Sequence, residues 1–180
     1  AENAAPLAQR TFAALADGAF HSGEALAEAA GVTRSGVWKS IETLRELGVQ
    51  IEAVTHRGYR LLQPSAALDA GRIVAALDPS LRPMLRRLEV EWSLPSTNGA
   101  LLDREPPPPG CCDVLLAEHQ SAGRGRRGRS WLAPLGGSLC LSIGASFDPL
   151  PRELSSLSLA IGVCTRRALV ERGACGLQLK

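Results

Sequence analysis

The stretch best suited to chemistry runs from Gly123 to Trp131 and reads Gly-Arg-Gly-Arg-Arg-Gly-Arg-Ser-Trp. Arginine side chains are permanently charged and bind phosphate or carboxylate oxygens two at a time. Glycines let the backbone approach a ligand closely and turn its N–H groups toward an anion. The indole of Trp131 offers a flat face for stacking on a ring such as a nucleobase. The combination predicts a loop that closes over a ligand with both a phosphate and an aromatic ring.

Arginine–glycine stretches also occur in disordered RNA-binding tails, so the flanking residues decide between the two interpretations. Residues 113–118 and 138–143 are short apolar runs bounded by glycine and proline, a pattern typical of strands. A disordered tail lacks apolar residues of this kind. We therefore predict a ligand-binding loop within a folded domain. Because its four arginines repel one another, we expect the loop to be mobile without ligand and to fold over a bound anion.

The composition is that of an ordinary globular protein. Of the 180 residues, 45% are hydrophobic and 21% are charged, and the net charge of +2 does not by itself indicate a nucleic-acid partner. Five cysteines without a CxxC pair favour free thiols in a reducing compartment. No signal peptide or bilayer-spanning apolar run is visible, which favours a cytoplasmic protein without a membrane partner.

Residues 1–64 carry the pattern of a winged helix-turn-helix module. Helical spacing covers residues 7–16, 23–30 and 34–47, with Ser22 and Thr33 as predicted N-caps and Gly31 at the turn. Residues 49–54 and 59–62 predict the two strands of a wing. In this motif the second helix of the pair enters the major groove of DNA. The candidate DNA-binding residues are Gly23, Glu24, Arg34, Ser35, Trp38, Lys39, Glu42, Arg45, His56, Arg57 and Arg60.

The charge of this module leaves an alternative open. Residues 1–62 hold six basic and seven acidic side chains, so a module that binds protein, or that only packs, has to be weighed against one that binds DNA. Most of the basic side chains lie in the helix over 34–47 and in the wing, where they can reach DNA phosphates. We therefore favour DNA binding.

Beyond residue 64 the pattern predicts alternating helices and strands. We expect a helix over 68–77, a strand over 88–92, a short helix after residue 98, a helix with an apolar stripe from Leu154 to Ala168 that covers a sheet face, and a strand over 176–180. The side chains of Ser96, Thr97 and Asn98 fit either a helix cap or a ligand site, and the residues alone favour the cap.

Taken in order, these features closely resemble the bifunctional biotin–protein ligases, which also repress the biotin operon. The resemblance lies in a winged helix, then Ser-Thr-Asn, then residues 117–131 with Gln120, the arginine–glycine loop and Trp131, and finally a strand, a helix and a strand that ends in Lys180. It implies an α+β protein. Residues 1–64 form the winged helix-turn-helix domain, and residues 65–180 form the first part of a mixed-sheet catalytic domain of the biotin/lipoate-ligase type, which we expect to be incomplete.

The resemblance also implies roles for individual residues. The catalytic residues are Arg126 and Lys180. Biotin is bound by Ser96, Thr97, Asn98, Gln120, Arg124, Gly125, Arg126 and Lys180. The adenylate is bound by Arg124, Arg126, Arg127 and Trp131. One departure is Pro95, which stands where the family usually has Asp before Ser-Thr-Asn.

The implied activity is that of an ATP-dependent, AMP-forming ligase. It uses biotin, ATP and Mg²⁺, with biotinyl-5′-AMP as intermediate and corepressor and without a dedicated metal site in the protein. The implied partners are the biotin carboxyl carrier protein of acetyl-CoA carboxylase, operator DNA and a second copy of the chain when ligand is bound. No Walker sequence occurs, so a P-loop does not hold the ATP.

The alternative is a non-catalytic, ligand-responsive winged-helix transcription factor on the same scaffold. Gln120, Arg126 and Trp131 are all present, and this favours the enzyme because a pure regulator has no need of a loop suited to ATP.

Overall fold

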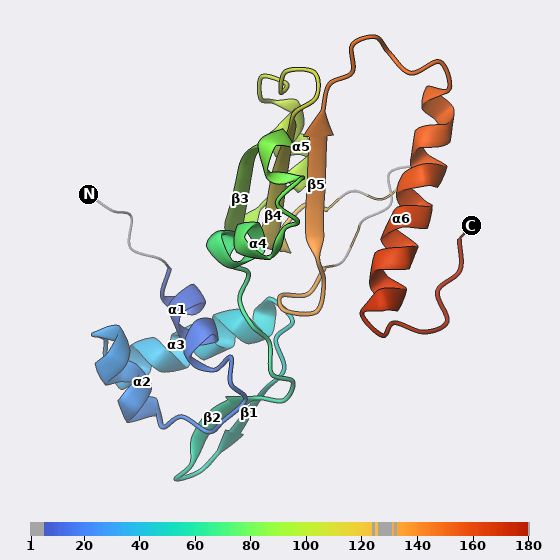
Figure 1. The fold of residues 1–180 in the computed structure, drawn as a ribbon. Helices are drawn as coiled ribbons and strands as arrows, with labels where there is room; N and C mark the ends of the chain where they lie inside the picture. The colour runs from blue at the N-terminus through green and yellow to red at the C-terminus, as the bar shows by residue number, and fades with distance from the viewer. Residues whose placement is uncertain (1–5, 124, 126–130, 132, 180) are drawn as a thin grey trace. The chain divides into compact units, whose positions relative to one another are not determined.

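A computed structural model describes residues 6–123, 125, 131 and 133–179 (Figure 1). The chain divides into two compact units, the first ending at Ser146 and the second beginning at Phe147. Both the winged helix and the sheet that follows it lie in the first unit. The domain boundary at residue 64 stays a prediction.

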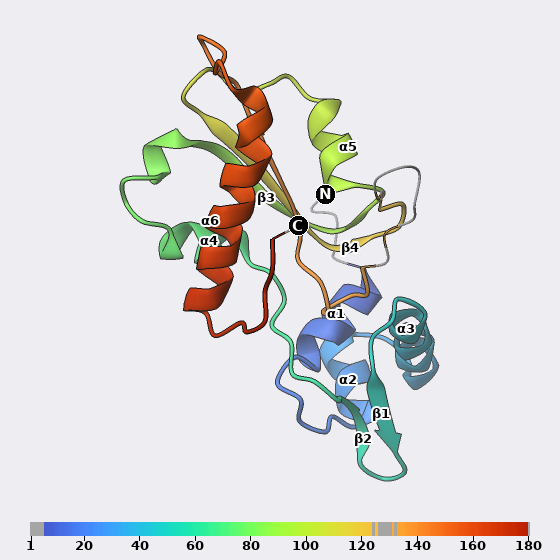
Figure 2. The same ribbon diagram turned by 90° about the vertical axis from the view of Figure 1, so that its right-hand side faces the viewer.

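The winged helix-turn-helix forms as the residue pattern predicts. Its elements are α1 (Leu7–Ala14), α2 (Gly23–Ala30), α3 (Arg34–Glu46) and the antiparallel strands β1 (Ile51–Val54) and β2 (Gly58–Leu61), seen together in Figure 2. The Ser22 hydroxyl accepts from the N–H of Ala25 at 3.0 Å, and the Thr33 hydroxyl accepts from that of Gly36 at 3.2 Å. Gly31 ends α2 in the left-handed conformation with φ of 64°. The two predicted caps and the glycine turn are confirmed.

Packing stabilises the winged helix more than helix propensity does, because helices of 8 to 13 residues are marginal in isolation. One apolar cluster joins all three helices to the wing. Its largest fully buried side chains are Phe12, Leu15, Val37, Ile41 and Leu44. A buried hydrogen bond of 2.8 Å from the Ser40 hydroxyl to that of Thr11 ties α3 to α1.

A three-stranded mixed sheet follows the winged helix. The elements are α4 (Ala70–Ala76), the 3-10 turn η1 (Arg82–Met84), β3 (Leu85–Leu94), α5 (Thr97–Leu102), β4 (Cys112–Gln120) and β5 (Cys140–Ala145). Strand β4 lies in the middle, parallel to β3 and antiparallel to β5 (Figure 1). Because a parallel pair needs a crossover connection, α5 and its loops return the chain to the starting end of the sheet. The crossover places the start of α5 and the end of β4 at the same edge.

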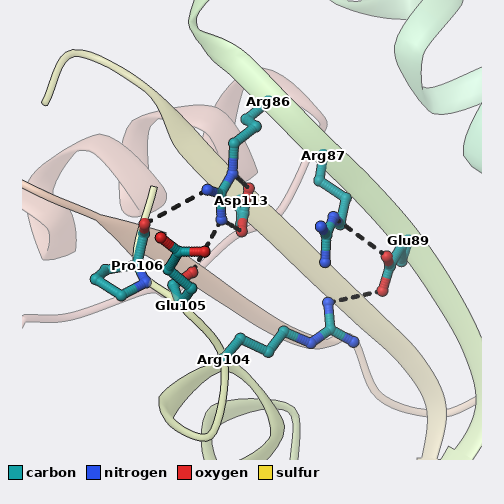
Figure 3. Close-up of polar contacts among 7 residues, drawn as sticks. All are labelled: Arg86, Arg87, Glu89, Arg104, Glu105, Pro106 and Asp113. Carbon is teal, nitrogen blue, oxygen red and sulfur yellow. Dashed lines mark hydrogen bonds and ion pairs between the residues drawn. The ribbon is translucent and has the colours of Figure 1, made fainter. Parts of the chain in front are cut away.

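An ion-pair network holds the opposite end of β3 and β4 (Figure 3). The guanidinium of Arg86 donates to both carboxylate oxygens of Asp113, at 2.8 and 2.5 Å, and to the carbonyls of Glu105 at 3.0 Å and Pro106 at 3.4 Å. The carboxylate of Asp113 is buried, and its bonds to Arg86 hold its pKa below the usual value. Nearby, Arg104 pairs with Glu89 at 2.7 Å.

The second unit holds the 3-10 turn η3 (Leu154–Ser156) and helix α6 (Leu157–Glu171). The predicted helix is therefore present, and the covering of a sheet face by its apolar stripe stays a prediction. The prediction of a strand over 176–180 is wrong for residues 176–179, which have no regular structure. A strand needs a hydrogen-bonding neighbour, whereas the carbonyl of Leu177 accepts from Arg166 Nε at 3.0 Å.

Candidate functional site

The side chain of Gln120, at the end of β4, fixes the start of α5. Its Oε1 accepts from the backbone N–H of Thr97 at 2.7 Å and from the Thr97 hydroxyl at 3.1 Å. The Thr97 hydroxyl also hydrogen-bonds the hydroxyl of Ser142 on β5 at 2.8 Å. Thr97 is only 3% exposed, so this small network joins α5, β4 and β5 away from water. A backbone N–H needs an acceptor, so the contact defines which side of the Gln120 amide is oxygen and leaves its NH₂ group as the donor.

Ser96 and Asn98 flank this network and differ in role. The Ser96 hydroxyl accepts from the N–H of Gly99 at 3.3 Å, so the cap favoured by the residues alone is confirmed. Asn98 is exposed. The binding of biotin by Ser96, Thr97 and Asn98 stays a prediction, and the hydroxyls of Ser96 and Thr97 already have partners within the protein.

Two cavities meet beside Gln120. The smaller, of about 250 Å³, is lined by Ser96, Thr97, Asn98, Leu139, Cys140, Leu141 and Ser142 together with Gln120 and Trp131. The larger, of about 540 Å³, is also lined by Gln120 and Trp131 and reaches the end of α3. The side chain of Trp131 is 61% exposed, so its ring is accessible for stacking. The arrangement suits a ligand in two parts.

The base of the arginine–glycine loop is held by backbone hydrogen bonds. The N–H of Ser121 donates to the carbonyl of Leu94 at 3.1 Å, and that of Ala122 to the carbonyl of Pro95 at 3.0 Å. The N–H of Trp131 donates to the carbonyl of Gly123 at 3.0 Å. The described residues therefore bring Trp131 next to Gln120. Gly125 is described and half-buried.

Several predicted site residues fall outside the described residues, namely Arg124, Arg126, Arg127 and Lys180. Their roles in binding and catalysis stay predictions, as does the folding of the loop over its ligand.

Two site residues on β5 were not expected from the sequence, Cys140 and Ser142. Both line the smaller cavity, and burial raises the pKa of the Cys140 thiol, which is therefore protonated at neutral pH. Their spacing of two residues places them on the same face of the strand. The alternation of the predicted strand indicated that Cys140 and Ser142 share a face. It did not indicate what that face contacts, because the hydrogen-bond partner of Ser142 is Thr97, 45 residues earlier in the chain.

The winged helix has a groove of its own, of about 710 Å³. It lies between the starts of α2 and α3 and the wing. The predicted DNA-binding residues that line it are Gly23, Glu24, Arg34, Ser35, Trp38 and His56. Trp38 is 55% exposed at the groove. The first turns of α3 thus present polar and aromatic groups at the position from which such helices contact DNA.

The other predicted DNA-binding residues lie outside the lining of this groove. Arg45 pairs with Glu42 at 2.8 Å and donates to the carbonyl of Ile51 at 3.0 Å. Arg60 pairs with Glu52 at 2.6 Å. Arg45 and Arg60 therefore have partners within the protein. Lys39 differs from them in that its side chain is exposed on α3.

The two wing arginines share one aromatic ring. The guanidinium of Arg57 lies 4.1 Å from the centre of the Phe20 ring, and that of Arg60 lies 4.7 Å from it. Cation–π contacts of this kind hold the two cations at the wing. The assignment of these residues to DNA binding stays a prediction.

The wing is fixed against the start of α2 by a pair of backbone hydrogen bonds. His21 and Tyr59 each donate to the other's carbonyl at 2.9 Å. Gly58 next to them has φ of 101°, and a Cβ at this position would lie 2.0 Å from the carbonyl oxygen of His21. Only glycine fits there, because a side chain meets both the unfavourable backbone angle and a backbone atom.

The fold defines a class, a winged helix-turn-helix protein in which a mixed sheet follows the winged helix. Residues 13–60 match a family model described as an HTH domain. The chain is 41% identical over 166 residues to the bifunctional ligase/repressor BirA of Salmonella typhimurium, a match that covers 92% of this chain and 50% of the relative. It is 38% identical over 179 residues to BirA of Escherichia coli, and this match covers 99% of this chain and 53% of the relative. The chain belongs to the family of these bifunctional ligase/repressors.

A third relative is the biotin–[acetyl-CoA-carboxylase] ligase of Mycobacterium tuberculosis, 39% identical over 105 residues. That match covers 53% of this chain and 40% of the relative. The chain thus spans about half the length of the BirA relatives it matches. Within the described residues, no helix combines the length and the apolar character needed to span a bilayer.

Proposed function

We propose that this chain belongs to a protein that activates biotin with ATP and transfers it to a lysine of the biotin carboxyl carrier protein. A carboxylate oxygen of biotin attacks the α-phosphorus of ATP, and pyrophosphate leaves with the electrons of the cleaved bond between the α-phosphorus and the bridging oxygen. The carrier lysine, as a neutral amine, then attacks the acyl carbon of biotinyl-5′-AMP. An amide forms, the amine nitrogen loses a proton to solvent, and AMP leaves with the electrons of the cleaved acyl–oxygen bond.

The observation that carries the proposal is the meeting of two cavities at Gln120 and Trp131. The smaller cavity offers hydroxyl and amide groups suited to the ureido head and carboxylate of biotin. The exposed ring of Trp131 suits the adenine, since stacking of a base on an aromatic side chain contributes about 1–3 kcal/mol. The acyl–phosphate anhydride of biotinyl-5′-AMP would then lie where the two cavities meet, near Gly123 and Trp131.

Phosphoryl transfer depends mainly on alignment and charge stabilisation. We assign the charge stabilisation to Arg124, Arg126, Arg127 and Lys180. The described residues contain no group of three or more His, Cys, Asp or Glu side chains placed to hold a metal ion. Mg²⁺ is therefore proposed to enter with the phosphates of ATP, a common mode for this ion.

We propose that the winged helix binds operator DNA and represses biotin synthesis genes when biotinyl-5′-AMP is bound. The groove beside Arg34, Ser35 and Trp38 supports this role, as does the repressor activity in the names of the BirA relatives. A ligand-dependent homodimer is part of the proposal, because paired half-sites in DNA require paired winged helices.

The test is incubation of the longer protein, extended as in its relatives, with biotin, ATP and Mg²⁺. Pyrophosphate release that depends on biotin is the expected result. Tight binding of biotin and ATP without pyrophosphate release would instead favour the non-catalytic transcription factor.

A second measurement tests the loop. Replacing Arg126 with Ala is expected to raise the release of free biotinyl-5′-AMP, because a charge-assisted hydrogen bond of about 1.5–3 kcal/mol is lost. An unchanged rate of release would remove Arg126 from the proposed role.

A further inference from the structure

The larger cavity is built partly from the end of α3, the helix that we propose binds DNA. Its lining includes Glu46, Leu47 and Gly48 from the end of α3, and His119, Trp131 and Pro134 from the sheet domain. The first turns of α3, with Arg34, Ser35 and Trp38, line the groove of the winged helix. One helix of 13 residues, about 20 Å long, therefore has a different site at each end.

The segment that follows Trp131 is anchored in the winged helix. Leu135 is 3% exposed and belongs to the same apolar cluster as Phe12 and Leu44. Its N–H donates to the carbonyl of Leu47 at 3.1 Å, a carbonyl at the end of α3. Pro134 lies against Gly48, where φ is 90° and an added Cβ would be 2.9 Å from the proline Cβ. The end of α3 and the residues after Trp131 are therefore held to each other by packing and by a backbone hydrogen bond.

Further contacts join the winged helix to the residues that follow it. The ring of Trp92 on β3 lies 5.8 Å from that of Phe12, centre to centre. Gly136 approaches Phe12 so closely that a Cβ there would lie 3.2 Å from its ring. Packing this tight transmits a shift of one element to its neighbour rather than absorbing it.

We infer that the C-terminal turn of α3 is a wall of the nucleotide subsite, so that an adenine nucleotide contacts the DNA-facing helix directly. This inference rests on the proposed function, which supplies the nucleotide. Trp131 stacks on the base from one side, and Glu46, Leu47 and His119 enclose it from the other. The Ser93 hydroxyl and Nδ1 of His119 form a hydrogen bond of 3.0 Å. The other ring nitrogen, Nε2, is therefore the atom that we expect to contact the nucleotide. The bound nucleotide restricts the motion of the end of α3. Because α3 is one continuous helix, its first turns, which line the groove of the winged helix, are restricted as well.

The test is hydrogen exchange, followed by mass spectrometry, on the whole chain with and without AMP. Protection is expected in residues 44–50 and 133–137 as well as in 118–123. Protection confined to residues 118–123 would overturn the inference and leave the proposed function intact. Absence of protection anywhere, with AMP or with biotin, would count against the proposed function itself.

A matched pair of variants tests the same point by affinity. Glu46→Phe puts a bulky ring into the cavity wall and is expected to weaken AMP binding about tenfold with biotin binding unchanged. Glu28→Phe makes the same change on the exposed face of α2, outside both cavities, and serves as the control. Equal AMP affinity in the two variants would contradict the inference.

Discussion

At the scale of single residues, the site depends on the amide of Gln120. Its oxygen accepts hydrogen bonds from two donors of the buried Thr97, and the residue lines both cavities. The same residue therefore holds the start of α5 and lines the cavities in which we propose that the ligand binds. The two roles can be separated because they use opposite ends of the amide.

Gln120→Leu is expected to lower the free energy of unfolding by about 1–3 kcal/mol, because the buried donors of Thr97 lose their acceptor. Gln120→Glu keeps an acceptor oxygen and is expected to regain most of this stability, while biotin affinity falls because the NH₂ donor is gone. Urea denaturation and a biotin titration measure the two effects. Equal stability of the two variants would show that the Thr97 contacts do not carry the role assigned to them.

Asp113 gives a prediction about pH. Its hydrogen bonds to Arg86 lower its pKa in the folded state, so the pair stabilises the protein fully above about pH 4 and progressively less as pH falls through the lowered pKa. Asp113→Asn is expected to lower Tm at neutral pH, by a margin that shrinks on acidification. Thermal unfolding of both proteins between about pH 7 and pH 3 measures this margin. A margin independent of pH would contradict the prediction, and Asp103→Asn, at an exposed position, is the control.

At the scale of elements, the position of the wing depends on Gly58. Gly58→Ala is expected to cost about 2–4 kcal/mol of stability, since it adds backbone strain and a clash with the carbonyl of His21. Gly31 also has a positive φ, but an added Cβ there meets no other atom, so Gly31→Ala is expected to lower the free energy of unfolding by only about 1 kcal/mol. Urea denaturation followed by circular dichroism compares the two. A cost at Gly58 no larger than that at Gly31 would show that the wing moves aside easily.

The elements that form from neighbouring residues could be predicted from the sequence. The caps at Ser22, Thr33 and Ser96 and the turn at Gly31 depend on contacts three or four residues apart, and all are confirmed. The predicted strand over 176–180 is wrong over 176–179 because an apolar run does not reveal whether a strand neighbour exists.

Contacts between distant residues could not be predicted in the same way. The acceptor for Thr97 comes from Gln120, 23 residues later, and the resemblance indicated a biotin ligand for Gln120 but not its hold on α5. Leu135 lies in the core of the winged helix although about 75 residues separate it from the wing. Local periodicity carries no signal for such pairs, because they depend on how the chain folds back on itself.

At the scale of the whole molecule, the first unit contains the groove that we propose binds DNA and the pair of cavities that we propose bind biotinyl-5′-AMP. Helix α3 takes part in both. We propose that the biotinyl-5′-AMP made by the ligase is also the ligand that controls DNA binding, because a single molecule would fill both cavities. Each half contributes to binding, and joining them removes the entropic cost of holding two separate molecules.

The most direct test is therefore a comparison of three affinities, those for biotin, for AMP and for biotinyl-5′-AMP, measured by calorimetry on the same protein. The account predicts that the conjugate binds at least about a hundredfold more tightly than AMP, because two linked halves act at high effective concentration. A conjugate that binds no more tightly than AMP alone would contradict it, since the two cavities would then not belong to one site.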